Sequence, residues 1–241
     1  MAAPTKKAQS MALFATVGGV AWTIGPFLGV LLSNSHLISF FSYATPFWFL
    51  AFCFFINFFL IAVHLQESAT QNEAQHHGSS NTTKNLLSVL KPKKVLFLFL
   101  CSISILIGWM MYQGFLALYL IEKYAFTVAL EGYAYAFSSV FWFLGGIFAN
   151  TYLLKHYRAK QQIILPLFLC ALAILSFLIA FTPFSVWILF ALSNSSQAIV
   201  TACFFALFAQ IVPKNGQGKI FGLWNAGFAL ASACGPFLSS L

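Results

Sequence analysis

Long apolar runs alternate with short polar connections along the whole chain. A helix that crosses about 30 Å of hydrocarbon needs roughly 20 apolar residues. Seven runs reach that length, near residues 11–33, 43–64, 95–121, 132–154, 162–181, 184–211 and 220–241. Their apolar positions are continuous and do not alternate, which argues against the strands of a membrane β-barrel. The pattern predicts an all-α membrane protein with about seven transmembrane helices.

The composition provides too few charges to cover the surface of a water-soluble domain. Hydrophobic residues make up 61% of the 241 residues, charged residues make up 7%, and Phe alone occurs 30 times. Soluble domains carry about a quarter of their residues as charged side chains. We therefore expect the lipid bilayer to surround most of this chain.

The basic residues lie almost entirely in alternate connections between the apolar runs. One set of connections carries Lys6, Lys7, Lys84, Lys91, Lys93, Lys94, Lys155, Arg158, Lys160, Lys214 and Lys219, whereas the other set carries Lys123 alone. Cytoplasmic loops of membrane proteins are enriched in Lys and Arg. The chain is thus predicted to cross the cytoplasmic (inner) membrane several times, with a cytoplasmic N-terminus and a flexible cytoplasmic linker at 65–94.

No pattern of an enzyme, a metal site or a nucleic-acid-binding surface is visible. The basic residues lie singly or in small groups and do not follow one face, as they would in a nucleic-acid-binding protein. The five cysteines each lie within an apolar run without a Cys-x-x-Cys pair, which favours packed thiols over metal ligands. We expect no catalytic activity, no cofactor, no metal and no nucleic-acid partner.

The first and last apolar runs resemble each other. The tetrapeptide Gly-Pro-Phe-Leu occurs at 25–28 and again at 235–238. When the two copies of the tetrapeptide are aligned, Leu13 falls opposite Leu223 and Ala21 opposite Ala231. A short basic connection precedes each of the two runs. Internal repeats in membrane proteins are typical of transporters built from two related bundles. Because the first and seventh runs are equivalent, each repeat is predicted to contain six helices.

With this repeat and the long polar connection, the chain resembles the major facilitator superfamily over essentially its whole length. Members of that family have two six-helix halves joined by a long cytoplasmic loop. The resemblance implies a partial facilitator fold in which 1–64 ends the N-terminal half, 65–94 is the central loop and 95–241 is a C-terminal half without its last helix. The runs would then be helices five to eleven of twelve, and transport would need a second chain or an upstream fragment that supplies the missing helices.

The stretch "AWTIGPFLGV" is similar to the antiporter motif on the fifth helix of that family, roughly G-x-x-x-G-P-x-x-G-G. Ala21 and Val30 depart from the motif. Proline bends a helix by removing one backbone hydrogen bond, and glycines let a neighbouring helix approach the bend. A plain packing kink explains the same residues, so both interpretations stay open. The residues assigned to the motif and to helix packing are Ala21, Gly25, Pro26, Gly29, Gly235 and Pro236.

Two further stretches resemble the family. "NTYLLKHYRAK" lies where a basic inter-helix motif is expected, with Lys155 and Arg158 at its basic positions. Asn150, Leu154 and Tyr157 depart from that motif, and a simple cytoplasmic basic loop explains the same stretch. "GWMMYQGFLALYLIEKYAFTVALEGYAYAF" is similar to the region of helices seven and eight in the drug:proton antiporter branch, which implies export of small organic molecules in exchange for protons.

Polar side chains inside the apolar runs are the candidates for a substrate path, because they are costly in lipid and usually face a cavity or another helix. Aromatic rings beside neutral amides suit an amphipathic organic molecule. Hydrogen bonds between helices are the alternative explanation. The candidates are Trp109, Tyr112, Gln113, Tyr133, Tyr135, Ser138, Asn194, Gln197 and Asn225.

The coupling of transport to protons cannot be assigned to a residue from the sequence. A proton-driven transporter needs a group that binds and releases a proton along the path. All four acids, Glu67, Glu73, Glu122 and Glu131, lie in connections or at the ends of apolar runs. In the family such acids often lie on helices that this chain lacks.

Two other interpretations compete with an exporter. A seven-helix receptor or light sensor would have an outside N-terminus, and a retinal sensor would need a lysine within its last helix, where none follows Lys219. A non-transporting remnant of a facilitator gene would share the ancestry and differs from an exporter only in activity.

Overall fold

The computed structural model describes residue 21 and residues 24–64, 86–157, 159–179, 182–213 and 216–239. Within these ranges every regular element is a helix and no strand occurs. This confirms the predicted all-α membrane fold. Lys6, Lys7, Arg158 and most of the predicted linker lie outside the described residues.

Six helices in the described part of the chain are long and apolar enough to cross a membrane. They contain α2 (Thr45–His64), α5 (Lys93–Tyr124), α6 (Val128–Phe148), α8 (Ala159–Ser176), α9 (Pro183–Ile211) and α10 (Gln217–Ser239). Shorter pieces join or extend them: η1 (Ser88–Leu90) before α5, the π-helical turn η2 (Ala149–Leu153) and α7 (Leu154–His156) after α6, and η3 (Phe177–Ile179) after α8. The described part of the first predicted run forms a shorter apolar helix, Ile24–Ser33.

Local signals in the sequence set the ends of these helices. Thr127 and Thr182 precede α6 and α9, and each side-chain oxygen accepts a hydrogen bond from the backbone N–H three residues later, at 3.2 and 3.3 Å. Pro183 begins α9, where its missing N–H would have no partner in any case. Helix α5 ends where Ala125 takes a left-handed conformation with a φ of 54°.

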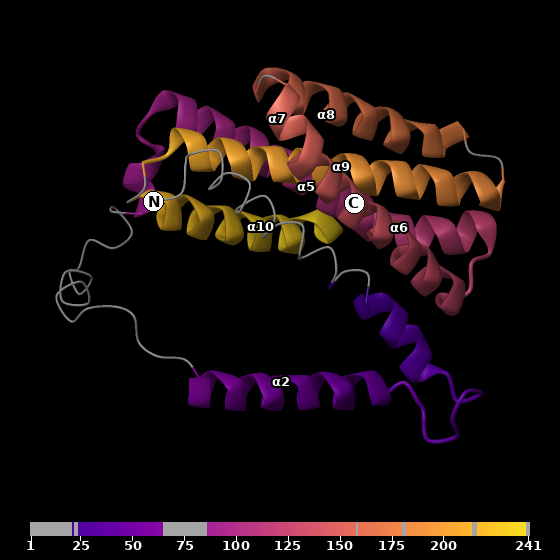
Figure 1. Ribbon diagram of the computed structural model, residues 1–241. Coiled ribbons are helices and arrows are strands. Elements are labelled where there is room, and N and C mark those ends of the chain that lie inside the picture. Colours follow the sequence, from indigo (N-terminus) through magenta and orange to yellow (C-terminus); the bar gives the residue numbers. More distant parts are fainter. Residues whose placement is uncertain are drawn as a thin grey trace.

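Helix α9 is the buried centre of the bundle. It packs between α6 and α8, while α10 packs against α5 (Figure 1). In the most apolar stretch of α9, 67% of the residues are buried inside the protein, against 17% in that of α10. A helix that is apolar all round is expected to be surrounded by other helices. The polar residues of α9 therefore lie among protein side chains.

Two glycines bring helix backbones into direct contact. Gly145 of α6 lies against the backbone of Ser195 in α9, where an added Cβ would be 2.9 Å from the Ser195 Cα. Gly235 of α10 lies against α5 in the same way, and an added Cβ would be 2.7 Å from the carbonyl carbon of Met110. Small residues at helix contacts are typical of membrane bundles, because close backbones gain van der Waals contact.

Two buried glutamines close the ends of helices at the same end of the bundle. Gln162 of α8 donates hydrogen bonds from its amide nitrogen to the carbonyl oxygens of Leu153 (3.2 Å) and Tyr157 (2.6 Å). Gln217 of α10 donates in the same way to Ala209 (2.9 Å) and Val212 (3.3 Å) at the end of α9. The last carbonyls of a helix lack partners within it, so each glutamine satisfies the end of the preceding helix.

Helix α2 lies apart from α5–α10 (Figure 1), and none of its residues is buried. Its Phe47 and Trp48 are 73% and 74% exposed. The helix Ile24–Ser33, in contrast, contacts α6, because a Cβ added to Gly132 would overlap the side chain of Val30. The surface of α2 is therefore suited to lipid or to another helix.

Candidate functional site

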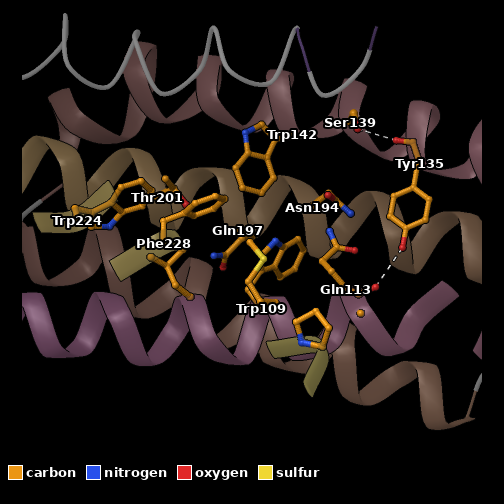
Figure 2. Close-up of a pocket in the computed structure, with 14 residues that line it drawn as sticks. Trp109, Gln113, Tyr135, Ser139, Trp142, Asn194, Gln197, Thr201, Trp224 and Phe228 are labelled. Carbon is orange, nitrogen blue, oxygen red and sulfur yellow. Dashed lines mark hydrogen bonds between the residues drawn. The ribbon is translucent and has the colours of Figure 1, made fainter. Parts of the chain in front are cut away.

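A pocket lies between α5, α6, α9 and α10, with a volume of about 330 Å³ (Figure 2). Side chains recur on each helix at the spacing that places them on one face, such as Tyr135, Ser139 and Trp142 on α6. The pocket is lined by Leu106, Trp109, Met110, Gln113, Gly114, Tyr135, Ser139, Trp142, Asn194, Gln197, Thr201, Trp224, Phe228 and Pro236. It carries no lysine, arginine, histidine, aspartate or glutamate within the described residues.

Aromatic rings form much of the wall of the pocket. Trp109 of α5 lies across from Trp142 of α6, with ring centroids 6.1 Å apart and planes inclined by 47°. On α10, Trp224 and Phe228 stack with centroids 5.8 Å apart. Figure 2 shows the two groups at different positions along the pocket. Such walls offer a large apolar contact area at a small cost in side-chain entropy.

Neutral amides supply the polar groups. Asn194 and Gln197 of α9 are only 4% and 2% exposed. The Asn194 amide nitrogen donates to the carbonyl oxygen of Phe190 at 2.9 Å, and the Cys170 thiol makes a long contact of 4.0 Å with the Gln197 amide oxygen. These bonds leave part of the hydrogen-bonding capacity of both amides free for a bound molecule.

Gln113 and Tyr135 connect α5 and α6 at one end of the pocket. The Tyr135 hydroxyl donates to the backbone carbonyl of Gln113 at 3.4 Å (Figure 2). The Tyr135 ring packs edge-on against Phe190, with centroids 5.1 Å apart. The amide oxygen of Gln113 is buried and has no hydrogen-bond partner within the described residues. An unpaired buried acceptor is costly, and such atoms are often found at sites that bind a ligand or water.

The pocket brings together five of the nine side chains that the sequence marked as substrate-path candidates. Trp109, Gln113, Tyr135, Asn194 and Gln197 line it, and so does Pro236, which was assigned to helix packing. Their role in binding stays a prediction.

Four candidates lie outside the pocket. Tyr112 packs in an apolar cluster and its hydroxyl lies 3.3 Å from that of Ser193. The Ser138 hydroxyl donates to the carbonyl oxygen of Tyr135 within its own helix. Tyr133 and Asn225 are on exposed faces of α6 and α10. The hydroxyls of Ser138 and Tyr112 thus make hydrogen bonds within and between helices, as the alternative to a substrate path expects.

Several lining residues were not predicted from the sequence. Ser139 and Thr201 lie one helical turn after Tyr135 and Gln197, on the same helix faces. Helical spacing from those two candidates would therefore have predicted them. Trp142, Trp224 and Phe228 are apolar residues in apolar runs, where nothing distinguishes a pocket wall from a lipid-facing side chain.

Gly25 and Gly29, assigned to the antiporter motif, lie in the helix Ile24–Ser33. Within the described residues, a Cβ added to either glycine would meet no atom within 4 Å. A role of these glycines in the motif stays a prediction. Pro26 and Gly29 line a second cavity, of about 340 Å³, against the start of α6. Ala21 and Lys155 are exposed, and Arg158 lies outside the described residues.

The thiols and acids form no cluster in the described part of the chain. All five cysteines are unpaired, and no group of three or more His, Cys, Asp or Glu side chains could hold a metal ion. The lining of the pocket combines aromatic rings with a few neutral hydrogen-bonding groups.

Comparison with known proteins gives the family. The sequence model described as Major Facilitator Superfamily matches residues 1–236. None of the curated proteins and none of the solved structures compared with the chain matches it. The family match covers nearly the whole chain, and the apolar helices agree with it. The chain therefore belongs to the Major Facilitator Superfamily of multi-pass membrane transporters.

Proposed function

We propose that this transporter exports small amphipathic organic molecules in exchange for protons, as in the drug:proton antiporter branch of the family. The observation that carries the proposal is the pocket between α5, α6, α9 and α10, whose walls are aromatic and whose polar groups are neutral amides. A pocket of this kind binds a largely apolar molecule by contact area and orients it by a few hydrogen bonds.

The pocket chemistry supports an uncharged or weakly polar substrate. Its tryptophans match a flat aromatic surface, while Asn194 and Gln197 are amides that both donate and accept hydrogen bonds. No lining side chain in the described chain carries a charge. A molecule of drug size with one or two polar groups fits these walls.

Alternating access requires two bundles that rock about a common site. Helices α5–α10 provide one of them. Because α2 contacts the other helices little and has no buried residue, we propose that α2 and the helix Ile24–Ser33 belong to the second bundle. Its remaining helices would come from other parts of the protein or from a second chain.

The charge distribution supports a cytoplasmic-membrane location with a cytoplasmic N-terminus. Lys91, Lys93 and Lys94 lie where α5 begins, Lys155 lies in α7 and Lys219 lies in the first turn of α10. Since successive spans run in opposite directions, these residues share one end of the bundle, whereas Lys123 lies at the other. The positive-inside rule places the lysine-rich end in the cytoplasm.

The proposal is tested by efflux of N-phenylnaphthylamine, an uncharged aromatic amine, from energised cells that express the protein. We expect faster efflux than in cells without it, and loss of this difference when a protonophore collapses the proton gradient. Trp109→Ala and Gln197→Leu should slow efflux, whereas Trp48→Ala, on the exposed surface of α2, should not. Efflux equal to that of empty cells would contradict export and favour a non-transporting remnant of the family.

A further inference from the structure

The second cavity lies between the first turn of α6 and the segment that runs from the helix Ile24–Ser33 into α2. It is lined by Pro26, Gly29, Val30, Ser33, Tyr43, Pro46, Val128, Glu131, Gly132 and Tyr135. Val30 and Gly132 are in direct contact beside it. The cavity therefore forms where the segment with the glycine–proline stretch meets the bundle that contains the pocket.

Glu131 is the one acidic side chain among the lining residues of this cavity. It is half-buried in the first turn of α6, whereas Glu122, the other acid in the described chain, is exposed. No lysine, arginine or histidine lines the cavity in the described ranges, and Tyr43 and Tyr135 are its other titratable groups. The sequence had placed Glu131 at the end of an apolar run, without a cavity.

The surroundings of Glu131 stabilise both its charged and its neutral form. The positive end of the α6 dipole favours a carboxylate in the first helical turn. The walls of the cavity are largely apolar, which favours the neutral acid. A carboxyl group held between two such influences can take up a proton from water and release it again without breaking an ion pair.

Tyr135 connects this carboxyl group to the pocket. It follows Glu131 by one helical turn and lines both cavities. Its hydroxyl donates to the carbonyl oxygen of Gln113 in α5, and its ring packs on Phe190 in α9. A displacement of Tyr135 would therefore alter the pocket wall and its contacts with α5 and α9.

We propose that Glu131 is the proton-binding group of the transporter and that Tyr135 couples its protonation to occupancy of the pocket. One proton from water converts the Glu131 carboxylate to the acid, and release of that proton to water reverses the step. The coupling rests on the proposed antiport function, whereas the protonation of Glu131 does not.

The protonation is tested by infrared spectroscopy of the purified protein over a pH series, which detects the carbonyl band of a protonated carboxyl group. All four glutamates contribute to the titrating carbonyl absorption, and we expect one component of it to be lost in Glu131→Gln. Glu122→Gln should retain this component, and Glu131→Asp should restore it at a shifted frequency. A titrating absorption that loses the same component in Glu131→Gln and in Glu122→Gln, or that is unchanged in Glu131→Gln, would overturn the assignment.

The coupling is tested by repeating the titration with saturating N-phenylnaphthylamine. Linkage is reciprocal, so a pocket coupled to Glu131 should shift the midpoint of the Glu131 component, by roughly one pH unit for a tenfold difference in affinity. Tyr135→Phe should show a smaller shift of the midpoint at a dye concentration that saturates this variant. An unchanged midpoint with bound dye overturns the coupling, whereas a dye that does not bind overturns the proposed function and leaves the first titration to decide on Glu131.

Discussion

Gly235 in α10 lies directly on the backbone of Met110 in α5, at the edge of the pocket. A Cβ on Gly235 would be 2.7 Å from the Met110 carbonyl carbon and 2.9 Å from the next backbone nitrogen. Real side chains do not approach backbone atoms this closely, so the glycine permits the contact. Because Pro236 follows Gly235 and lines the pocket, this contact helps to set the width of the site.

We predict that Gly235→Ala destabilises the protein. The added methyl group must push two backbones apart, and overpacking of this kind costs roughly 1–3 kcal/mol. Thermal unfolding in detergent should show a lower midpoint than the wild type.

The matched control is Gly222→Ala in the same helix, where an added Cβ would meet nothing within 4 Å. Alanine is favoured over glycine in a helix interior by about 1 kcal/mol, so this variant should be at least as stable as the wild type. Equal effects of the two substitutions would show that the α5–α10 contact is not as close as described.

A second prediction concerns Gln217, which donates to the carbonyl oxygens of Ala209 and Val212. Gln217→Leu would leave these carbonyls without that donor at a buried helix end, and an unmade hydrogen bond costs about 1–3 kcal/mol. We expect a lower unfolding midpoint. Asn225→Leu, on an exposed face of the same helix, should change it little. A Gln217→Leu variant as stable as Asn225→Leu would refute the capping role.

A third prediction separates the polar from the apolar part of binding. Gln197→Leu removes a buried amide from the pocket without opening a large cavity. Loss of one hydrogen bond of roughly 0.5–1.5 kcal/mol should weaken binding of N-phenylnaphthylamine by about two- to tenfold. The N-methylated dye, which has no N–H donor, should lose less. The control is Ser195→Ala, because the Ser195 hydroxyl donates to a carbonyl oxygen of its own helix. If Gln197→Leu weakened binding of both dyes equally, an orienting role for Gln197 would be contradicted.

The helices could be predicted from the sequence because length and continuous hydrophobicity are enough to identify a membrane span. The run near 95–121 became α5 (Lys93–Tyr124) and the run near 184–211 became α9 (Pro183–Ile211), with ends set by Thr182 and Ala125. The continuation of α6 through a π-helical turn was not predictable, because nothing in the hydrophobic pattern distinguishes it from an α-helix.

The pocket could be predicted only in part, and the reason is physical. Polar groups such as Asn194 and Gln197 are costly in lipid, so their presence in an apolar run indicates an interior face. The side chains of Trp142 and Trp224 are stable both against lipid and inside a protein. Their position in the pocket wall therefore depends on how the helices are rotated. Helix rotation also determines that Tyr112, three residues after Trp109, faces an apolar cluster and not the pocket. The sequence does not contain this rotation.

The contrast between Gly25 and Gly235 has a similar origin. Both begin a copy of the repeated tetrapeptide, yet Gly235 contacts a backbone, whereas a Cβ added to Gly25 has no atom of the described residues within 4 Å. Sequence spacing shows that a close approach is sterically possible. Whether another helix or lipid covers the glycine depends on tertiary packing, because both are equally favourable neighbours for an apolar helix face.

The most direct test of the proposed binding site is whether an aromatic molecule binds in the pocket against Trp109 and Trp142. Energy transfer from tryptophan to N-phenylnaphthylamine should be measured for the purified wild type, Trp109→Ala and Trp48→Ala. An aromatic contact contributes about 0.5–1.5 kcal/mol beyond its buried area, so we predict that Trp109→Ala weakens binding by roughly tenfold or more, whereas Trp48→Ala leaves the dissociation constant unchanged. Unchanged affinity in Trp109→Ala, or equal loss in both variants, would contradict the assignment of this pocket as the substrate site.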